Sequence, residues 1–236
     1  MSGHSKWANI KNRKGAADKK RSEVFTRASK NILTAIREFG GNTNPEMNYK
    51  LKQTIEKARE VNMPKENIDR LINRFEERKA NLVSIIFEGY GASGVPVIIE
   101  VESDNKNRIV AEIRGILKKY GGSLGETNSV MFQFEKKGRI EVGREMTDDE
   151  LLELMDHGLE DSRGKEILTS VSGLQEVVDQ MKNRGIEVVD YGLTYVCLNP
   201  TVIKSEAELD KLAEMIEELE ENEDVFNVYG GYDYEE

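Results

Sequence analysis

The spacing of apolar residues changes abruptly near residue 80, and this change constrains the fold more than any other feature of the 236-residue chain. Before residue 80, apolar side chains recur every three or four residues, which is typical of amphipathic helices. After residue 82, short runs rich in β-branched residues alternate with helical patterns, which is typical of strands between helices. The sequence therefore predicts an α+β protein in which a helical part precedes a mixed part.

Three short helices are predicted in the first part. They are expected over residues 24–39, from residue 44 and from residue 62, and Gly or Pro marks their ends. The buried face of the second helix is predicted to consist of Met47, Leu51, Ile55 and Ala58. The polar stretch 74–81 is expected to separate these helices from the rest of the chain.

The mixed part contains a recognisable order of elements. A hairpin is predicted at residues 82–101, followed by a helix over 107–120 and a strand over 129–135. Residues 138–199 then follow the order strand, helix, strand, strand, helix, strand, which is the ferredoxin-like plan. Thr147–Glu150 and Ser172–Gln175 are interpreted as capping boxes that open its two helices.

A helix from residue 205 and a strand over residues 225–229 are surplus to the ferredoxin-like unit. They are predicted to complete the middle domain, so that the ferredoxin-like unit is inserted within it. The predicted domains are a basic helical domain (1–79), an α+β middle domain (80–137 with 201–236) and an inserted ferredoxin-like domain (138–200).

The charges of the chain are unevenly distributed. Its formal net charge is −10, yet residues 1–80 contain 19 Lys and Arg against 10 Asp and Glu, a net of +9. Residues 81–236 contain 15 basic and 34 acidic residues, a net of −19. A basic region attracts nucleic acid, whereas an acidic region is repelled by it and suits a basic partner, such as a basic ribosomal protein.

The most basic stretch is the opening segment GHSKWANIKNRKGAADKKRS, residues 3–22. Lys and Arg neutralise phosphates, Trp offers a ring for stacking with an unpaired base, and Asn can donate to phosphates or base edges. The predicted nucleic-acid-binding residues are Lys6, Trp7, Asn9, Lys11, Asn12, Arg13, Lys14, Lys19, Lys20 and Arg21. A solvated charge run and a cleaved mitochondrial presequence are the alternative interpretations of the same residues.

Catalytic signatures are scarce. The chain has two His and one Cys, so no zinc-site spacing can be written, and it contains neither a P-loop nor G-x-S-x-G. The loop Gly89–Gly94 matches G-x-G-x-x-G, but a strand rather than a helix is expected after it. The acidic run Glu214–Asp224 is interpreted as a solvated helix face. Neither enzyme activity nor a cofactor is predicted, and a small-molecule enzyme that uses the Gly89–Gly94 loop is the remote alternative.

The composition favours a cytoplasmic protein. No apolar run approaches the roughly 18 residues of a transmembrane helix, and the N-terminus lacks the apolar core of a secretory signal. A single cysteine, Cys197, provides no disulfide framework, which fits a reducing compartment. No membrane partner is expected.

Several short motifs resemble those of the YebC/PmpR family. They are Gly3–Lys11, Asn62–Lys65, Glu88–Gly91, Asp104–Arg108, Gly121–Gly125 and Asn227–Tyr229. The resemblance spans essentially the whole chain. It implies an N-terminal three-helix domain and two α+β domains, the third of them ferredoxin-like and inserted into the second. Because it starts at residue 3, it also implies that the basic segment belongs to the mature protein.

The resemblance implies a non-enzymatic, nucleic-acid-binding regulator of gene expression. Members of the family are described as DNA-binding transcriptional regulators, which is the function predicted here. Other members act in translation on ribosomes and aid synthesis through proline-rich stretches, so a ribosome-associated, RNA-binding translation factor is the alternative. The expected partner is accordingly DNA or ribosomal RNA.

The chain departs from its relatives at two places. Many relatives have His where this chain has Asn12, so no imidazole role is carried to that position. Relatives often have glycine near residues 74–80, where this chain reads RFEERKA. The resemblance therefore does not carry a flexible hinge to this chain.

Overall fold

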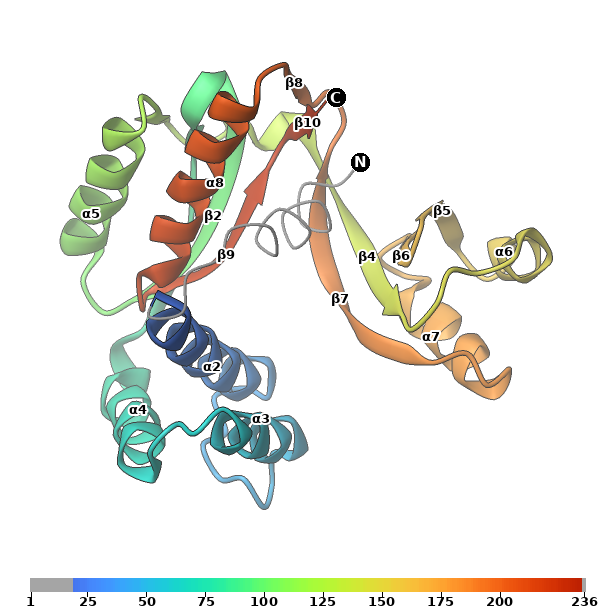
Figure 1. The fold of residues 1–236 in the computed structure, drawn as a ribbon, viewed down its shortest axis with the longest axis horizontal. Coiled ribbons are helices and arrows are strands. Elements are labelled where there is room, and N and C mark those ends of the chain that lie inside the picture. Colours follow the sequence, from blue (N-terminus) through green and yellow to red (C-terminus); the bar gives the residue numbers. More distant parts are fainter. Residues whose placement is uncertain (1–18, 235–236) are drawn as a thin grey trace.

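The computed structural model describes residues 19–234, apart from the side chains of residues 19–23 and of Thr26. Figure 1 shows a bundle of helices, a sheet covered by two helices, and a second sheet that is reached through two long strands. The predicted fold class is confirmed: a three-helix domain precedes two α+β domains, and the second of these is ferredoxin-like and inserted into the first. The residue boundaries given above for the domains remain predictions.

The helical domain consists of α2 (Lys19–Glu38), α3 (Tyr49–Glu60) and α4 (Lys65–Arg78), followed by a 3₁₀ turn (Lys79–Asn81). Each helix turns an apolar face inward. The shared core consists of Ile32, Ala35, Ile36, Leu51, Ile55, Ala58, Met63, Ile68 and Phe75. The polar stretch 74–81 is helical throughout, so the helical domain joins the next domain without an irregular linker.

The helix α3 begins at Tyr49, later than predicted, because Asn48 caps it from inside the domain. The Oδ1 atom of Asn48 accepts a hydrogen bond from the Leu51 N–H at 3.0 Å, and its Nδ2 donates to the Ala35 carbonyl at 2.9 Å. This fully buried cap leaves the preceding residues in a turn, where Met47 is 69% exposed. The prediction that Met47 belongs to the buried face was therefore wrong.

The middle domain is built on a sheet with the strand order β3-β1-β2-β9. Its strands are β1 (Val83–Tyr90), β2 (Pro96–Ser103), β3 (Ser123–Leu124) and β9 (Val225–Gly230), and all neighbours are antiparallel. The predicted hairpin corresponds to β1 and β2. A small parallel sheet of β8 (Thr201–Ile203) and β10 (Tyr232–Tyr234) lies at one end of the domain.

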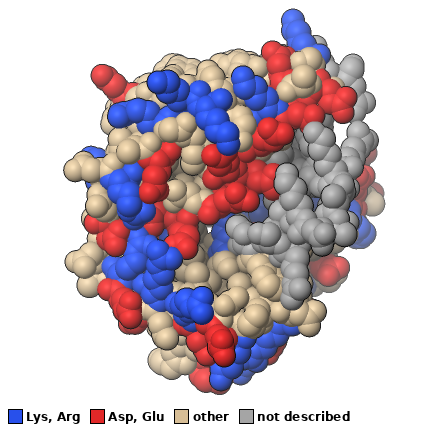
Figure 2. All heavy atoms as spheres, turned by 60° about the vertical axis from the view of Figure 1, so that its left-hand side comes forward, with Lys and Arg blue, Asp and Glu red and all other residues tan. Residues whose placement is uncertain are grey.

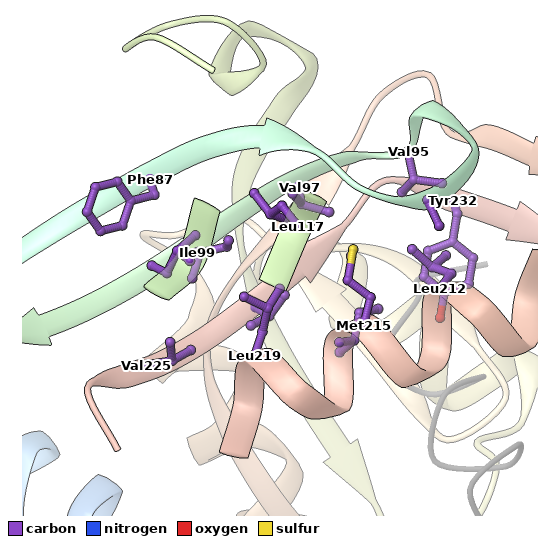
Figure 3. Close-up of a cluster of buried hydrophobic side chains, with 14 of the residues drawn as sticks. Phe87, Val95, Val97, Ile99, Leu117, Leu212, Met215, Leu219, Val225 and Tyr232 are labelled. Atoms are coloured by element: carbon purple, nitrogen blue, oxygen red, sulfur yellow. The ribbon is translucent and has the colours of Figure 1, made fainter. Parts of the chain in front are cut away.

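Two helices, α5 (Lys106–Lys119) and α8 (Glu206–Glu221), lie side by side over one face of the middle sheet (Figure 1). Figure 3 shows side chains of α8, including Met215 and Leu219, directed toward Val97 and Ile99 of β2. Burying an aliphatic side chain of this size contributes about 1.5–3 kcal/mol. The middle domain therefore depends on a helix that the chain supplies only after the inserted domain.

The inserted domain runs through β4 (Phe134–Val142), α6 (Asp148–Met155), β5 (Leu159–Arg163), β6 (Glu166–Thr169), α7 (Leu174–Asn183) and β7 (Val188–Cys197). Its strand order is β5-β6-β4-β7 with antiparallel neighbours, which is the ferredoxin-like order. The chain leaves the middle domain through β4 and returns through β7. These two strands are paired along their whole length (Figure 1).

Two local predictions for this region were wrong. The strands expected at 129–135 and 138–142 are replaced by the single strand β4, because Gly138 stays within the ladder and pairs with both Thr169 and Leu193. The capping box expected at Ser172 is absent, since the N-cap residue of α7 is Gly173 and makes no side-chain cap. The box at Thr147–Glu150 is present in both directions, as predicted.

Candidate nucleic-acid interface

The predicted nucleic-acid-binding residues fall at the N-terminal edge of the described chain. Those that lie outside the described residues are Lys6, Trp7, Asn9, Lys11, Asn12, Arg13 and Lys14. Lys19, Lys20 and Arg21 form the first turn of α2. The structure thus describes α2, the helix that follows the basic segment in the sequence, and most of the segment lies outside the described residues.

The first turn of α2 has an unusual charge for a helix N-terminus. It contains no acidic residue, and its first three residues are basic. The N-terminal end of a helix carries partial positive charge, so cations there raise the free energy of the helix. An anion such as a phosphate group lowers it. This end of the helical domain is therefore suited to an anionic ligand.

Further along the helical domain, some cations already have carboxylate partners and others do not. Lys30, Arg37, Arg74 and Arg78 pair with carboxylates of the middle domain. A second set is exposed and forms no ion pair with any residue that the structure describes: Arg27, Lys57, Arg59, Lys65 and Arg70. The second set can neutralise phosphates without breaking an internal contact.

The helical and middle domains meet in a set of arginines and carboxylates that we call the interdomain seam. Its members are Arg37, Arg74, Arg78, Glu102, Asp104, Arg108, Glu223 and Asp224. The seam determines how the basic helical domain is oriented against the acidic remainder of the molecule.

Arg37 is the most buried cation of the seam. Its side chain is 6% exposed, and its Nε donates to Glu102 Oε2 at 2.6 Å. The guanidinium carbon lies 5.3 Å from the centroid of the Phe226 ring, within the range of cation–π attraction. Burial lowers the pKa of Arg37 and the Glu102 carboxylate opposes that shift, but an arginine stays charged in a protein.

Asp224 is the centre of the seam, and its side chain is 3% exposed. One oxygen accepts from Arg78 at 2.7 Å, and the other accepts from Arg108 at 2.6 Å and from the Ser103 hydroxyl at 2.7 Å. Burial alone would raise the pKa of Asp224, but the hydrogen bonds from these three groups outweigh burial and lower it. Arg78 also donates twice to Asp104 at 3.0 Å.

The motif that begins at Glu88 has a structural role. The buried Glu88 carboxylate accepts hydrogen bonds from the backbone N–H groups of Asn128, Val130 and Met131 at 2.7, 2.9 and 2.7 Å. Burial raises the pKa of Glu88, but these three bonds outweigh it and lower the pKa overall. A Cβ on Gly91 would lie 2.6 Å from Met215 Cε, so the glycine loop is packed against α8 and is followed by a strand. This is not the strand–loop–helix arrangement of a dinucleotide site.

Within residues 19–234, no group of three or more His, Cys, Asp or Glu side chains is placed to hold a metal ion. No described helix combines the length and the apolar character needed to cross a bilayer. His157 contacts Glu176 at 2.7 Å on the surface of the inserted domain.

Sequence reasoning missed the interdomain seam. It assigned Glu214–Asp224 to a solvated helix face, but Asp224 follows α8 and is buried, and Glu223 pairs with Arg74. Asp104–Arg108 was noted only as a motif that resembles the family. Their shared partners are far away in the chain, and nothing in a single sequence marks such a pairing.

Comparison with known proteins identifies relatives that match this chain over nearly its whole length. The family model for the N-terminal domain of TACO1/YebC proteins matches residues 5–78, and the model for the second and third domains of TACO1/YebC proteins matches residues 82–232. Relatives described as "probable transcriptional regulatory protein" include one from Dictyoglomus turgidum, 41% identical, with 99% of this chain and 96% of the relative covered. Another from Syntrophus aciditrophicus is 43% identical, with the same shares covered.

A solved structure is also similar to this chain. The crystal structure of a conserved hypothetical protein from Aquifex aeolicus superimposes with a TM-score of 0.66 at 33% sequence identity, and the match covers 95% of each chain. A relative from Finegoldia magna, also described as a probable transcriptional regulatory protein, is 38% identical over the full length of both chains. The chain therefore belongs to the TACO1/YebC family, as its motifs predicted.

Proposed function

We propose that this protein is a non-enzymatic regulator of gene expression that binds nucleic acid through its basic N-terminal segment and the adjoining end of α2. One observation carries the proposal: the helical domain combines a basic helix N-terminus with exposed cations that have no carboxylate partner among the described residues. The descriptions of the relatives as probable transcriptional regulatory proteins favour DNA as the target. The protein would act in the cytoplasm.

The mechanism follows from the polarity of the molecule. Phosphates attract the helical domain, whereas the acidic remainder, with a net charge of −19, is repelled by them. The seam holds the two parts in one orientation, so the basic end leads. Figure 2 shows acidic side chains gathered in a band across one face of the molecule, with Lys and Arg on either side of it. Binding through any such acidic surface would be unfavourable.

The test is a charge reversal of Lys11, Arg13 and Lys14 to Glu in the full chain. If each residue contacts one phosphate of duplex DNA, the slope of log K against log salt should flatten by about 0.9 per lost contact. Affinity should fall strongly at low salt, as measured by fluorescence anisotropy, while the circular dichroism spectrum stays the same.

A matched control reverses Lys106, Arg114 and Lys118, which are exposed on α5 and have no described ion pair. This variant has the same net charge as the test variant, and it should keep most of the affinity. Equal loss in both variants would contradict the proposal. Titrations with duplex DNA and with ribosomal RNA separate the two candidate targets. A promoter-binding protein should discriminate among DNA sites by about 1–3 kcal/mol per mismatched pair.

A further inference from the structure

A large groove lies where the three domains meet. It has a volume of about 1300 Å³, and it is bounded by the open face of the inserted sheet, by α2 and by β9. Its lining includes the aromatic side chains of Tyr191, Tyr195, Phe226 and Tyr229. Pockets for drug-sized ligands have volumes of about 300–1,000 Å³, so this groove is suited to a longer ligand.

Carboxylates outnumber cations along the groove. The acidic lining residues are Glu38, Glu100, Glu141, Glu145, Glu166 and Asp190, and the basic ones are Lys136, Arg139, Arg163 and Lys165. This excess repels phosphates and favours a cationic ligand.

Three of the four groove cations already form hydrogen bonds within the protein. Arg139 donates to Asp190 at 2.6 Å, and Arg163 donates to Asp161 at 2.9 Å. Lys165 donates to the Gly143 carbonyl at 2.8 Å. Arg139 thus pairs with two groove carboxylates, Asp190 and Glu141, whereas no described cation pairs with Glu145 or Glu166.

Glu166 is the clearest case. Its side chain is buried, with 4% exposure, yet its Oε1 atom has no hydrogen-bond partner. In the register of the sheet, Glu166 lies directly opposite Glu141 on β4, and like charges in that position are destabilising. It also lies opposite Arg163 on β5, whose guanidinium is turned to Asp161. A buried carboxylate oxygen without a partner costs free energy that a bound cation recovers.

We propose that this groove binds a basic polypeptide segment of a partner protein, with a Lys or Arg side chain of that segment bound to Glu166. The acidic excess selects a cationic chain over a nucleic acid, and the volume of the groove selects a peptide over a single ammonium ion. Tyrosine rings in the groove already accept cations: Lys136 lies 5.6 Å from the Tyr195 centroid, and Lys182 lies 5.3 Å from the Tyr191 centroid. This proposal is argued from the described lining of the groove and does not depend on the proposed nucleic-acid binding.

The test measures binding of a fluorescein-labelled Arg- and Gly-rich peptide to the full-length protein by anisotropy. Glu166→Gln preserves the shape of the side chain and should weaken binding about tenfold, as expected for the loss of a hydrogen bond to a charged group. Glu145 is an exposed groove residue, so Glu145→Gln should leave the domain folded. It should weaken binding severalfold. Glu153→Gln removes the same charge from α6, outside the groove, and should change binding less than about twofold.

A second measurement is independent of peptide affinity. The free Glu166→Gln variant should melt at a temperature no lower than the wild type, because the unpaired carboxylate and its repulsion by Glu141 are removed. Peptide should raise the melting temperature of the wild type and not that of the variant. Equal weakening by Glu166→Gln and Glu153→Gln, or a marked loss of stability in Glu166→Gln, would overturn the proposal.

The same experiment separates this site from the proposed function. Glu166→Gln should leave DNA and RNA binding unchanged, and the Lys11, Arg13 and Lys14 reversal should leave peptide binding unchanged. If Glu166→Gln strengthens nucleic-acid binding tenfold, the groove holds nucleic acid and the proposal fails. If the triple reversal strengthens peptide binding tenfold, the chain's own basic segment fills the groove and the partner assignment fails.

Discussion

At the scale of single residues, the stability of the interdomain seam depends most on Asp224. Its carboxylate accepts hydrogen bonds from two arginines and a serine while it is nearly excluded from water. Removing one partner of a buried ion pair leaves the other charges uncompensated, which costs far more than losing an exposed pair. Glu223, the preceding residue, pairs with Arg74 at the surface and is about half exposed.

We expect Asp224→Asn to lower the free energy of unfolding by about 3 kcal/mol. Glu223→Gln is the matched control, and it should lower it by less than about 1 kcal/mol because solvent screens the exposed pair. Urea denaturation followed by circular dichroism measures both values. Similar values for the two variants would show that the burial of Asp224 does not increase its contribution to the free energy of unfolding.

The effect of Asp224 should depend on pH in a defined direction. The pKa of Asp224 is lower in the folded protein than in the unfolded chain, where the pKa of an aspartate is about 3.9. Its contribution to stability is therefore fully present above that pH and is lost as the pH falls through the folded-state pKa. The difference in unfolding free energy between wild type and Asp224→Asn should be constant from pH 5 to 7 and shrink below about pH 4. A difference that grows on acidification would contradict this assignment.

The contrast between Asp224 and its neighbours shows what a single sequence reveals. The acidic run and the periodicity of α8 are visible in the sequence, and the apolar side chains at three- and four-residue spacing there are buried: Leu209, Leu212, Ile216 and Leu219. Which carboxylate of the run is buried depends on arginines 116 and 146 positions away. Local spacing contains no information about those partners.

At the scale of elements, α4 is the connection that matters most. Its last turns and the following 3₁₀ turn form a continuous helical stretch, and this stretch contributes Arg74 and Arg78 to the seam. A helical connection has few conformations, so it fixes the direction in which the helical domain leaves the sheet.

Glu77→Gly should destabilise the end of α4 by about 1 kcal/mol relative to Glu77→Ala, because glycine has more backbone freedom in the unfolded state. Amide hydrogen exchange should become faster in α4 and remain unchanged in α5. The position of Glu77 is exposed, so no buried contact is lost. Unchanged exchange in α4 would show that its end is held by tertiary contacts and not by helix propensity.

Element prediction succeeded where periodicity was strong and failed where a side chain from elsewhere decided the boundary. The ferredoxin-like order, the hairpin and the Thr147–Glu150 box could be read from local patterns. The start of α3 could not, because Asn48, whose Oδ1 caps the helix, is held in place by its hydrogen bond to the Ala35 carbonyl of another helix. At α7, the Ser170 hydroxyl accepts from the Gly173 N–H, which displaces the expected role of Ser172.

At the scale of the whole molecule, the seam makes one body of two domains with opposite charge. Fixing their orientation by ion pairs makes that orientation sensitive to salt, because exposed pairs are screened over about 3 Å at 1 M ionic strength. The charge asymmetry behind the candidate nucleic-acid interface could be predicted from the sequence. The groove around Glu166 could not, because it depends on the register of three strands.

Replacing Arg37 and Arg78 together with Ala should loosen the helical domain and increase the radius of gyration in small-angle X-ray scattering. The reason is that both arginines join the two domains and leave Glu102 and Asp224 unpaired when removed. Arg74→Ala, which removes an exposed pair, should leave the scattering curve unchanged. Identical curves for all three proteins would show that apolar contacts alone hold the domains together.

The position of β9 in the middle sheet has a consequence for synthesis of the chain. Because β9 and α8 are translated after the inserted domain, the ferredoxin-like domain can complete its core on the ribosome while the middle domain cannot. We therefore expect the inserted domain to fold before the middle domain. Until β9 arrives, one side of β2 is an unpaired strand edge, the kind of surface on which nascent chains aggregate. The rate of this final closing step should limit how much of the newly made protein escapes misfolding.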